Sequence, residues 1–275
     1  ILYNVENVEV SNVENDPQEF EVFPAWAPDG RTLYYCSAHF ERQDTVSVDV
    51  EVIRRSKEIK YALYRKTFDP DTRRFGPREL VYPAPTDSLA PANLPPRERL
   101  AAAGYSDSIA SPLKGRLEGA GSSVTLPRVS PDGRYLMFTM GHYGVFHIWH
   151  HEADLYLMDL SGDGRIRPMD ELNSPDTESY HSWSSNGRWG VFSSRRNDGG
   201  YTRPFIAHID ADGHGSKPFE LPQANPDFHR QFMKSFNIPE FMLGPVEQTP
   251  QEFARVLKAS DGEPVKYVGK LRSEK

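Results

Sequence analysis

Histidines and carboxylates are concentrated in the segment GHYGVFHIWHHEADLY, and a further histidine, His181, follows later in the chain. Imidazole and carboxylate groups are ordinary ligands of zinc and iron. On a strand, His147 and His151 would project to one side and His150 to the other, so only some of these groups can converge without a turn. No HExxH or similar spacing supports a metal site. We therefore expect hydrogen-bonded histidines and no cofactor. The segment contains His142, His147, His150, His151, Glu152 and Asp154.

Arginines gather in a second segment, SSRRNDGGYTR, which joins paired arginines to a glycine-rich loop and an aromatic residue. A guanidinium group binds a carboxylate or phosphate through two parallel hydrogen bonds. With Trp149, this segment could bind an anionic or glycan ligand. Alternatively, its arginines pair with acids such as Asp154, Glu178 or Asp198 and brace neighbouring repeats, which is the interpretation that we favour. The candidate ligand-binding residues of both segments are Trp149, His150, His151, His181, Arg195, Arg196, Tyr201 and Arg203.

The chain lacks the sequence patterns of common catalytic and nucleotide sites. The G-x-S-x-G elbow of α/β-hydrolases is absent, as are the phosphate loop and the dinucleotide fingerprint. The single thiol, Cys36, lies in an apolar strand, where we expect it to pack rather than react. It cannot form an intramolecular disulfide. We therefore assign no catalytic residue and favour a protein that is not an enzyme.

A hairpin pattern occurs three times in the chain, and the histidine-rich and arginine-rich segments follow its second and third copies. The copies read FPAWAPDGRTLYYCS, LPRVSPDGRYLMFTM and YHSWSSNGRWGVFSS. Each has an apolar lead-in, a turn of the Asp-Gly or Asn-Gly type and a run rich in large apolar residues, which predicts a β-hairpin. We assign the turn residues a structural role, because one carboxylate in a turn does not make a calcium site. They are Asp29, Gly30, Asp132, Gly133, Asn186 and Gly187.

Each hairpin leads to a third strand that ends in Asp, a glycine-bearing turn and a fourth strand. Such a unit of about 40 to 50 residues has the size of a propeller blade. The VSVDVEV stretch at 46–52 predicts an added hairpin arm or a solvated loop. We expect two helices and a last strand in the extension, which packs on the propeller. The expected divisions are a propeller over 1–222, with a partial blade (1–17), blades (20–82, 124–172 and 179–222) and a Pro/Ala-rich insertion (83–123), then a C-terminal extension over 223–275.

The net charge is −7, from 32 basic and 39 acidic residues, and it disfavours nucleic acid as a partner. No apolar stretch approaches the roughly 20 residues of a transmembrane segment. A single cysteine fits both the cytoplasm and the periplasm. The chain starts at Ile1 without Met, which we interpret as a mature product or an excised fragment.

The segments LPRVSPDGRYLMFT, IWHHEADLYLMDL, ESYHSWSSNGRWGVFSSRR and YTRPFIA resemble PD40 repeats, the WD40-like β-propeller repeats of TolB-like proteins. Among TolB-like proteins, the chain most resembles the envelope propeller proteins of the Bacteroidetes. The resemblance implies an all-β propeller of four-stranded blades with a short, partly helical C-terminal tail. It also implies a periplasmic or cell-envelope location and a non-catalytic role in protein or glycan binding, including peptidoglycan-type glycans. Only three clear blades and a partial one are visible, so the propeller is incomplete, a fragment, or contains degenerate repeats.

Three functional hypotheses follow. The leading one is a binding propeller in the bacterial envelope. The second is a metal-dependent hydrolase or lyase that uses His150, His151 and His181 at the mouth of the channel. The third is the regulatory propeller of a larger enzyme. The fold alone does not separate them.

Overall fold

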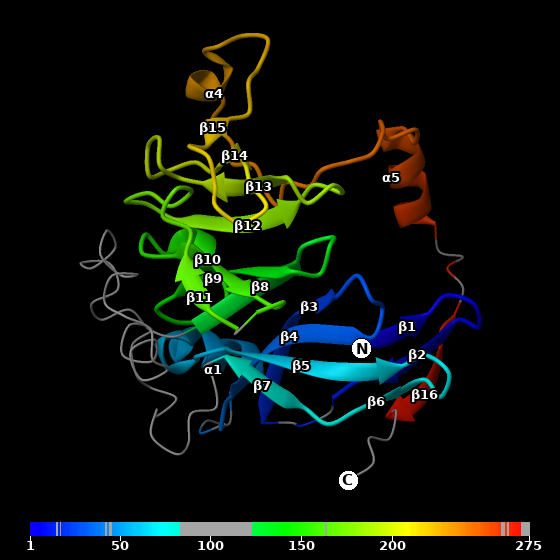
Figure 1. Ribbon diagram of the computed structural model, residues 1–275. Coiled ribbons are helices and arrows are strands. Elements are labelled where there is room, and N and C mark those ends of the chain that lie inside the picture. The colour runs from blue at the N-terminus through cyan, green and yellow to red at the C-terminus, as the bar shows by residue number, and fades with distance from the viewer. Residues whose placement is uncertain are drawn as a thin grey trace.

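Three consecutive antiparallel sheets form the body of the molecule and stack upon one another (Figure 1). The computed structural model describes residues 1–14, 16, 18–41, 43, 46–82, 123–162, 164–259, 262 and 264–270. We call the sheets the first, second and third blades. The first blade contains β3 (Glu19–Trp26), β4 (Thr32–His39), β5 (Ala62–Asp69), β6 (Arg74–Phe75) and β7 (Glu79–Tyr82). The second contains β8 (Ser123–Val129), β9 (Tyr135–Gly141), β10 (Asp154–Asp159) and β11 (Ile166–Pro168). The third contains β12 (Glu178–Trp183), β13 (Trp189–Ser194), β14 (Arg203–His208) and β15 (Phe219–Glu220).

In the second and third blades, strands that follow one another in sequence are neighbours. In the first blade the outer edge is divided, because β6 and β7 both pair with β5. The first strands of the blades, β3, β8 and β12, lie beside one another, as the inner strands of a propeller do. The structure thus confirms the predicted all-β fold of propeller blades, with four strands in the second and third blades and a divided fourth strand in the first.

The second blade is buried on both faces. Successive side chains of a strand point to opposite faces, so Phe138 and Tyr156 pack against the first blade while Met137 and Leu157 pack against the third. All four are at most 2% exposed. This explains why β9 reads as the continuous apolar run YLMFTM, since neither face of this blade meets solvent.

The predicted turns close the three hairpins. Their glycines, Gly30, Gly133 and Gly187, have φ of 64°, 74° and 67°, the left-handed region that glycine enters without a steric penalty. The preceding Asp or Asn accepts a hydrogen bond from the backbone N–H two residues later in all three turns, at 2.8 to 3.1 Å. These contacts give the turn residues a local structural role.

Residues 46–52 do not form the expected hairpin arm or solvated loop, because α1 (Val48–Arg54) begins here and is followed by the short helix η1 (Ser56–Glu58). The Glu51 side chain is fully buried and lies 2.7 Å from Arg55 Nη1. The guanidinium of Arg55 also lies 4.5 Å from the centre of the Phe40 ring. The ion pair between Glu51 and Arg55, four residues apart, favours a helix over the alternating strand. Of the expected insertion at 83–123, all but Ser123 lies outside the described residues.

The two ends of the chain meet in a separate three-stranded sheet. It contains β1 (Leu2–Asn4), β2 (Glu9–Asn12) and β16 (Lys266–Lys270), and β16 runs parallel to β2. The expected partial blade at the N-terminus is thus joined by the last strand of the extension (Figure 1).

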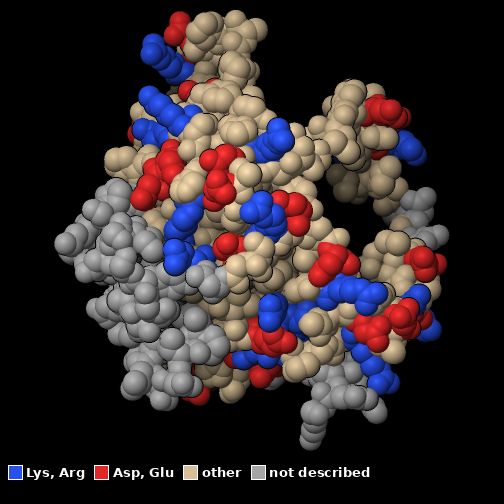
Figure 2. All heavy atoms as spheres, viewed as in Figure 1, with Lys and Arg blue, Asp and Glu red and all other residues tan. Residues whose placement is uncertain are grey.

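The C-terminal extension also contains α4 (Phe228–Gln231) and α5 (Pro250–Lys258). No residue of α5 is buried, and this helix stands apart from the blades in Figures 1 and 2. On the face shown in Figure 2, basic and acidic side chains alternate. Within the described ranges, no helix is long and apolar enough to cross a membrane.

Candidate functional site

Two aromatic side chains emerge from the loop between β9 and β10. Phe146 is 65% exposed and Trp149 is 64% exposed. Trp149 ends the short helix η3 (His147–Trp149), and Phe146 precedes that helix. The Trp149 N–H donates to the Phe146 carbonyl at 2.9 Å, so both exposed side chains belong to one turn of this loop. We call Phe146 and Trp149 the aromatic platform.

Arg195 supports the Trp149 ring from the third blade. Its guanidinium lies 4.9 Å from the centre of the ring, a cation–π contact. Arg195 itself is only 9% exposed. Its Nη2 donates to the carbonyls of Gly199 and Gly200, so the loop that follows β13 fixes the guanidinium. An exposed ring that is held in this way loses little side-chain entropy when a partner binds.

The exposed histidine beside the aromatic platform has an acidic partner. His151 Nδ1 lies 2.8 Å from Asp176 Oδ1, and the His151 side chain is 69% exposed. Nearby, Glu152 Oε1 lies 3.1 Å from His142 Nδ1 and 3.5 Å from His150 Nδ1. Burial lowers the pKa of His150. The histidine-rich loop is therefore organised around two carboxylates.

The other two histidines of interest are fully buried. His147 Nδ1 lies 2.9 Å from Thr125 Oγ1, and burial together with His150 lowers the pKa of His147 to about 3. His181 Nε2 lies 3.0 Å from the Met137 carbonyl, and burial lowers its pKa to about 3 as well. Within the described part of the chain, no three histidine, cysteine or acidic side chains are arranged to hold a metal ion. This arrangement does not favour the hypothesis of a metal site at His150, His151 and His181.

Arg196 forms an ion pair with Glu178, one of the acids that the sequence analysis named as possible partners of the arginines. Its Nη2 lies 3.0 Å from the fully buried carboxylate of Glu178. Ser174 and Ser194 also donate to this carboxylate, at 2.6 and 2.8 Å. The Arg196 guanidinium lies 4.6 Å from the centre of the Phe205 ring. A buried carboxylate that loses its cation is costly, so we assign Arg196 to the packing of the third blade.

Arg203 is 2% exposed and holds the C-terminal extension rather than the aromatic platform. Its guanidinium donates to the carbonyls of Lys234, His229 and Phe232 at 2.7, 2.8 and 2.9 Å. It also lies 5.2 Å from the centre of the Tyr201 ring. These donors are engaged by the backbone of the extension, which covers the outer face of the third blade.

The structure therefore brings together only part of the candidate set. Trp149, His150, His151 and Arg195 surround one loop surface, whereas His181 and Arg203 lie inside the molecule. Phe146 belongs to the same surface and was missed by the sequence reasoning. The only sequence signal for it was an aromatic residue three positions before Trp149.

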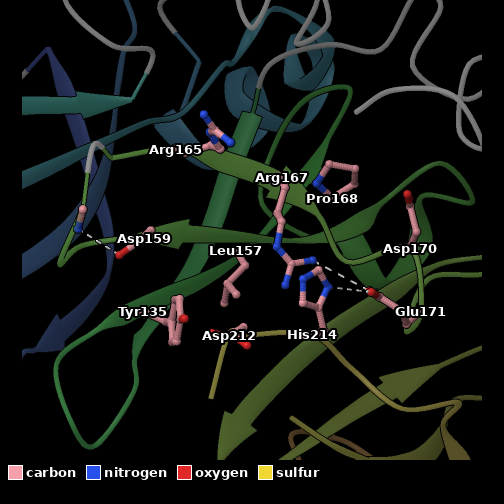
Figure 3. A pocket seen from close by; sticks show the side chains of 11 residues that line it. Tyr135, Leu157, Asp159, Arg165, Arg167, Pro168, Asp170, Glu171, Asp212 and His214 are labelled. Carbon is pink, nitrogen blue, oxygen red and sulfur yellow. Dashed lines mark hydrogen bonds and ion pairs between the residues drawn. The ribbon is translucent and has the colours of Figure 1, made fainter. Parts of the chain in front are cut away.

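A second feature is a cavity of about 750 Å³ between the second blade and the turn after β14 of the third blade (Figure 3). Leu157 and Tyr135 line it, and the Tyr135 hydroxyl donates to the Ala211 carbonyl at 3.0 Å. Arg167 donates to the Gly213 carbonyl. His214 Nδ1 lies 3.1 Å from Glu171 Oε1.

These contacts join the turn after β14 to the second blade, so this cavity marks a seam between blades. The sequence reasoning missed it. The only signal in the sequence was the pair of glycines in the turn DADGHG. The structure gives the reason for one of them, since a Cβ atom on Gly213 would lie 2.7 Å from Leu157 Cδ2.

Cys36 offers no reactive thiol. It is 0% exposed in the core between the first and second blades, and burial raises the pKa of its thiol. A thiol nucleophile needs the opposite shift and some access to solvent.

No family model matches the chain. No curated protein matches it. Among solved structures, TolB from Acinetobacter baumannii has a TM-score of 0.35 and 16% identity, over 72% of this chain and 32% of TolB. The β-propeller domain of the Trilobed protease from Pyrococcus furiosus has a TM-score of 0.37 and 11% identity, over 77% and 46%. A putative TolB from Agrobacterium tumefaciens has a TM-score of 0.34 and 16% identity, over 81% and 68%.

The chain spans less than half the length of the first two of these proteins. At this level of identity and TM-score, the similarities carry no argument about family or function. The propeller arrangement of this chain rests on its own strand order and on the packing of its three blades.

Proposed function

We propose that this chain is part of a non-catalytic propeller that binds a protein partner through the aromatic platform. The observation that carries this proposal is the Trp149 ring, which is 64% exposed and supported by the nearly buried Arg195. Trp, Tyr and Arg dominate the residues that contribute most to protein interfaces. A fixed, exposed Trp with a second exposed aromatic side chain beside it has the properties of such an interface.

The bacterial cell envelope is the proposed location, and it rests on the resemblance of the repeats to PD40 repeats. A periplasmic binding role is compatible with the absence of a nucleotide or nucleophile motif in the sequence. A regulatory propeller of a larger enzyme would use the same surface toward a catalytic domain.

A glycan of the peptidoglycan type is the second candidate partner. The observation that favours it is the exposed His151–Asp176 pair in the same loop region as the Trp149 ring. A flat aromatic ring with hydrogen-bonding groups beside it can contact the apolar face and the hydroxyl groups of a sugar.

The test uses Trp149→Ala with Trp189→Ala as its control. Trp189 is also exposed, at 37%, but it lies at the start of β13 and packs against His208. A photo-crosslinking amino acid at position 146 should form one discrete adduct with a protein in the producing cells, and Trp149→Ala should abolish it. The Trp189→Ala variant should retain the adduct.

Co-sedimentation with purified peptidoglycan sacculi tests the second candidate. Binding that depends on Trp149 and not on Trp189 would favour the glycan. If neither the adduct nor sedimentation depends on Trp149, the proposed surface is wrong.

A further inference from the structure

A second, separate cavity lies on the face of the first blade that points away from the second blade. It has a volume of about 330 Å³. Residues 12–14, at the end of β2 and just after it, form one side of it, and strands β3 and β4 form the other. Val13, Pro24 and Leu33 supply its apolar walls. This cavity shares no residue with the aromatic platform or with the seam between the second and third blades.

Tyr35 gives this apolar cavity a buried polar group. The residue is 4% exposed and lines the cavity, yet its hydroxyl oxygen has no hydrogen-bond partner in the described structure. Its ring stacks on Tyr64, with the centroids 5.9 Å apart. A buried hydroxyl without a partner costs about 1–3 kcal/mol. Burial raises the pKa of Tyr35, so the hydroxyl keeps its proton and remains a donor.

Carboxylates stand at the rim of the same cavity. Glu14 forms an ion pair with the buried ammonium group of Lys66, so the negative charge of Glu14 is neutralised by a residue of the first blade. Glu21, on β3, also lines the cavity, and burial raises the pKa of its carboxyl group. Glu21 and Tyr35 line the same cavity from neighbouring strands, β3 and β4. The cavity therefore combines apolar walls and one buried donor with an acidic side, where Glu21 is joined by Asn12, Glu14 and Asp16.

Apolar walls with a few convergent polar groups are the usual composition of a ligand pocket. A backbone amide is the group that offers a carbonyl acceptor and an N–H donor side by side. We propose that this cavity binds an apolar residue of a peptide, with Tyr35 Oη donating to the peptide carbonyl and Glu21 accepting from the peptide N–H. The proposal concerns a second site and does not depend on the aromatic platform.

The experiment uses the full chain and two small probes. N-acetyl-L-leucinamide carries the amides and an apolar side chain, and N-acetylglycinamide carries the amides alone. Saturation-transfer NMR titrations should show saturable binding of the leucine probe and no saturation with the glycine probe over the same range. Tyr35→Phe should weaken binding of the leucine probe about tenfold, the loss expected for one hydrogen bond.

Tyr34→Phe is the matched control. Tyr34 is the neighbouring residue on β4 but packs in the core between the first and second blades, on the opposite face of the strand. This control should bind the leucine probe as the wild type does. Because Tyr35→Phe removes a buried hydroxyl that has no partner, this variant should fold and unfold at a higher temperature than the wild type.

Three results would overturn the proposal. The first is equal binding of the leucine probe and the glycine probe. The second is binding of the leucine probe by Tyr35→Phe as tight as that of the wild type. The third result is a lower unfolding temperature for Tyr35→Phe, which would mean that an internal water satisfies the hydroxyl.

Discussion

Leu126 and Tyr180 occupy the same position in consecutive blades, seven residues before the turn glycine, and both have left-handed backbone conformations, with φ of 55° and 52°. Phe23 has this position in the first blade, with φ of 56°. In each inner strand the pairing register shifts at this point, which marks a β-bulge. Bulky residues rarely adopt this conformation. The three blades therefore share a strained bend at the same position of their first strands, β3, β8 and β12, which lie beside one another.

We expect Tyr180→Gly to be more stable than Tyr180→Ala. Both variants lose the same ring, so their difference isolates the backbone, and relief of the left-handed strain should favour glycine by about 1 kcal/mol. Urea unfolding measures this difference. The control pair is Ile206→Gly and Ile206→Ala on β14, a half-buried position without positive φ, where alanine should be the more stable by about 0.5–1 kcal/mol. Alanine more stable than glycine at position 180 would contradict the prediction.

Gly213→Ala should weaken the seam between the second and third blades. The new Cβ atom would lie 2.7 Å from Leu157 Cδ2 and 3.2 Å from the Tyr135 ring, and φ at this position is 81°. We expect a loss of about 2–4 kcal/mol in the free energy of unfolding, from overpacking added to backbone strain. The control is Gly133→Ala, where φ is 74° but nothing lies within 4 Å of the added Cβ atom. That variant should lose only about 1 kcal/mol, and equal losses would exclude the seam as the cause.

The repeated hairpins could be predicted because their chemistry is local. An Asp-Gly or Asn-Gly turn between apolar runs needs no knowledge of distant residues, and the strand order follows from such turns. The pairing of β16 with β2 could not be predicted in this way, because Lys266 and Glu9 are partners across almost the whole chain. Residues 46–52 were misread because their alternation fits a strand, whereas Glu51 and Arg55 stabilise a helix.

The candidate site was predictable only in part, for a related reason. Trp149 and Arg195 are residue types that bind ligands and lie in loops, so the sequence reasoning found both. The neighbouring residues in the sequence do not distinguish Arg195 from Arg203. In the structure, Arg195 supports the exposed Trp149 ring, whereas Arg203 donates to three carbonyls of the extension. The Tyr35 cavity could not be found in the sequence, since its walls come from segments that meet only in the fold.

Acid should destabilise the protein through two buried histidines. His147 and His181 have pKa values lowered to about 3 by burial, whereas in the unfolded chain each has a pKa of about 6.5. The unfolded state therefore binds more protons below pH ~6.5, and stability falls as the pH decreases from there toward 3. Each histidine contributes a slope of up to about 1.4 kcal/mol per pH unit in this window.

Urea unfolding between pH 7.5 and 5 measures this slope. Aspartates with lowered pKa values, such as Asp159, lose their contribution below about pH 4, outside this range. His181→Gln keeps a donor for the Met137 carbonyl but cannot titrate, so it should reduce the slope by the contribution of one histidine. A slope that is unchanged in this variant would mean that His181 is not buried as a neutral side chain.

Arg203→Lys should release the C-terminal extension from the third blade. The guanidinium binds the carbonyls of His229, Phe232 and Lys234, and a lysine cannot reach all three, because it presents a single ammonium group. We expect the Phe236 N–H, which donates to the Thr202 carbonyl at 3.1 Å, to lose protection in hydrogen exchange. The free energy of unfolding should fall by about 2–3 kcal/mol.

Arg188→Lys is the control, because Arg188 is exposed beside the turn between β12 and β13. It should leave both exchange and stability unchanged. Crosslinking at position 146 should also survive Arg203→Lys, since Arg203 binds the extension and not the aromatic platform. Loss of the crosslink with unchanged protection of Phe236 would instead place Arg203 in partner binding, as the sequence first suggested.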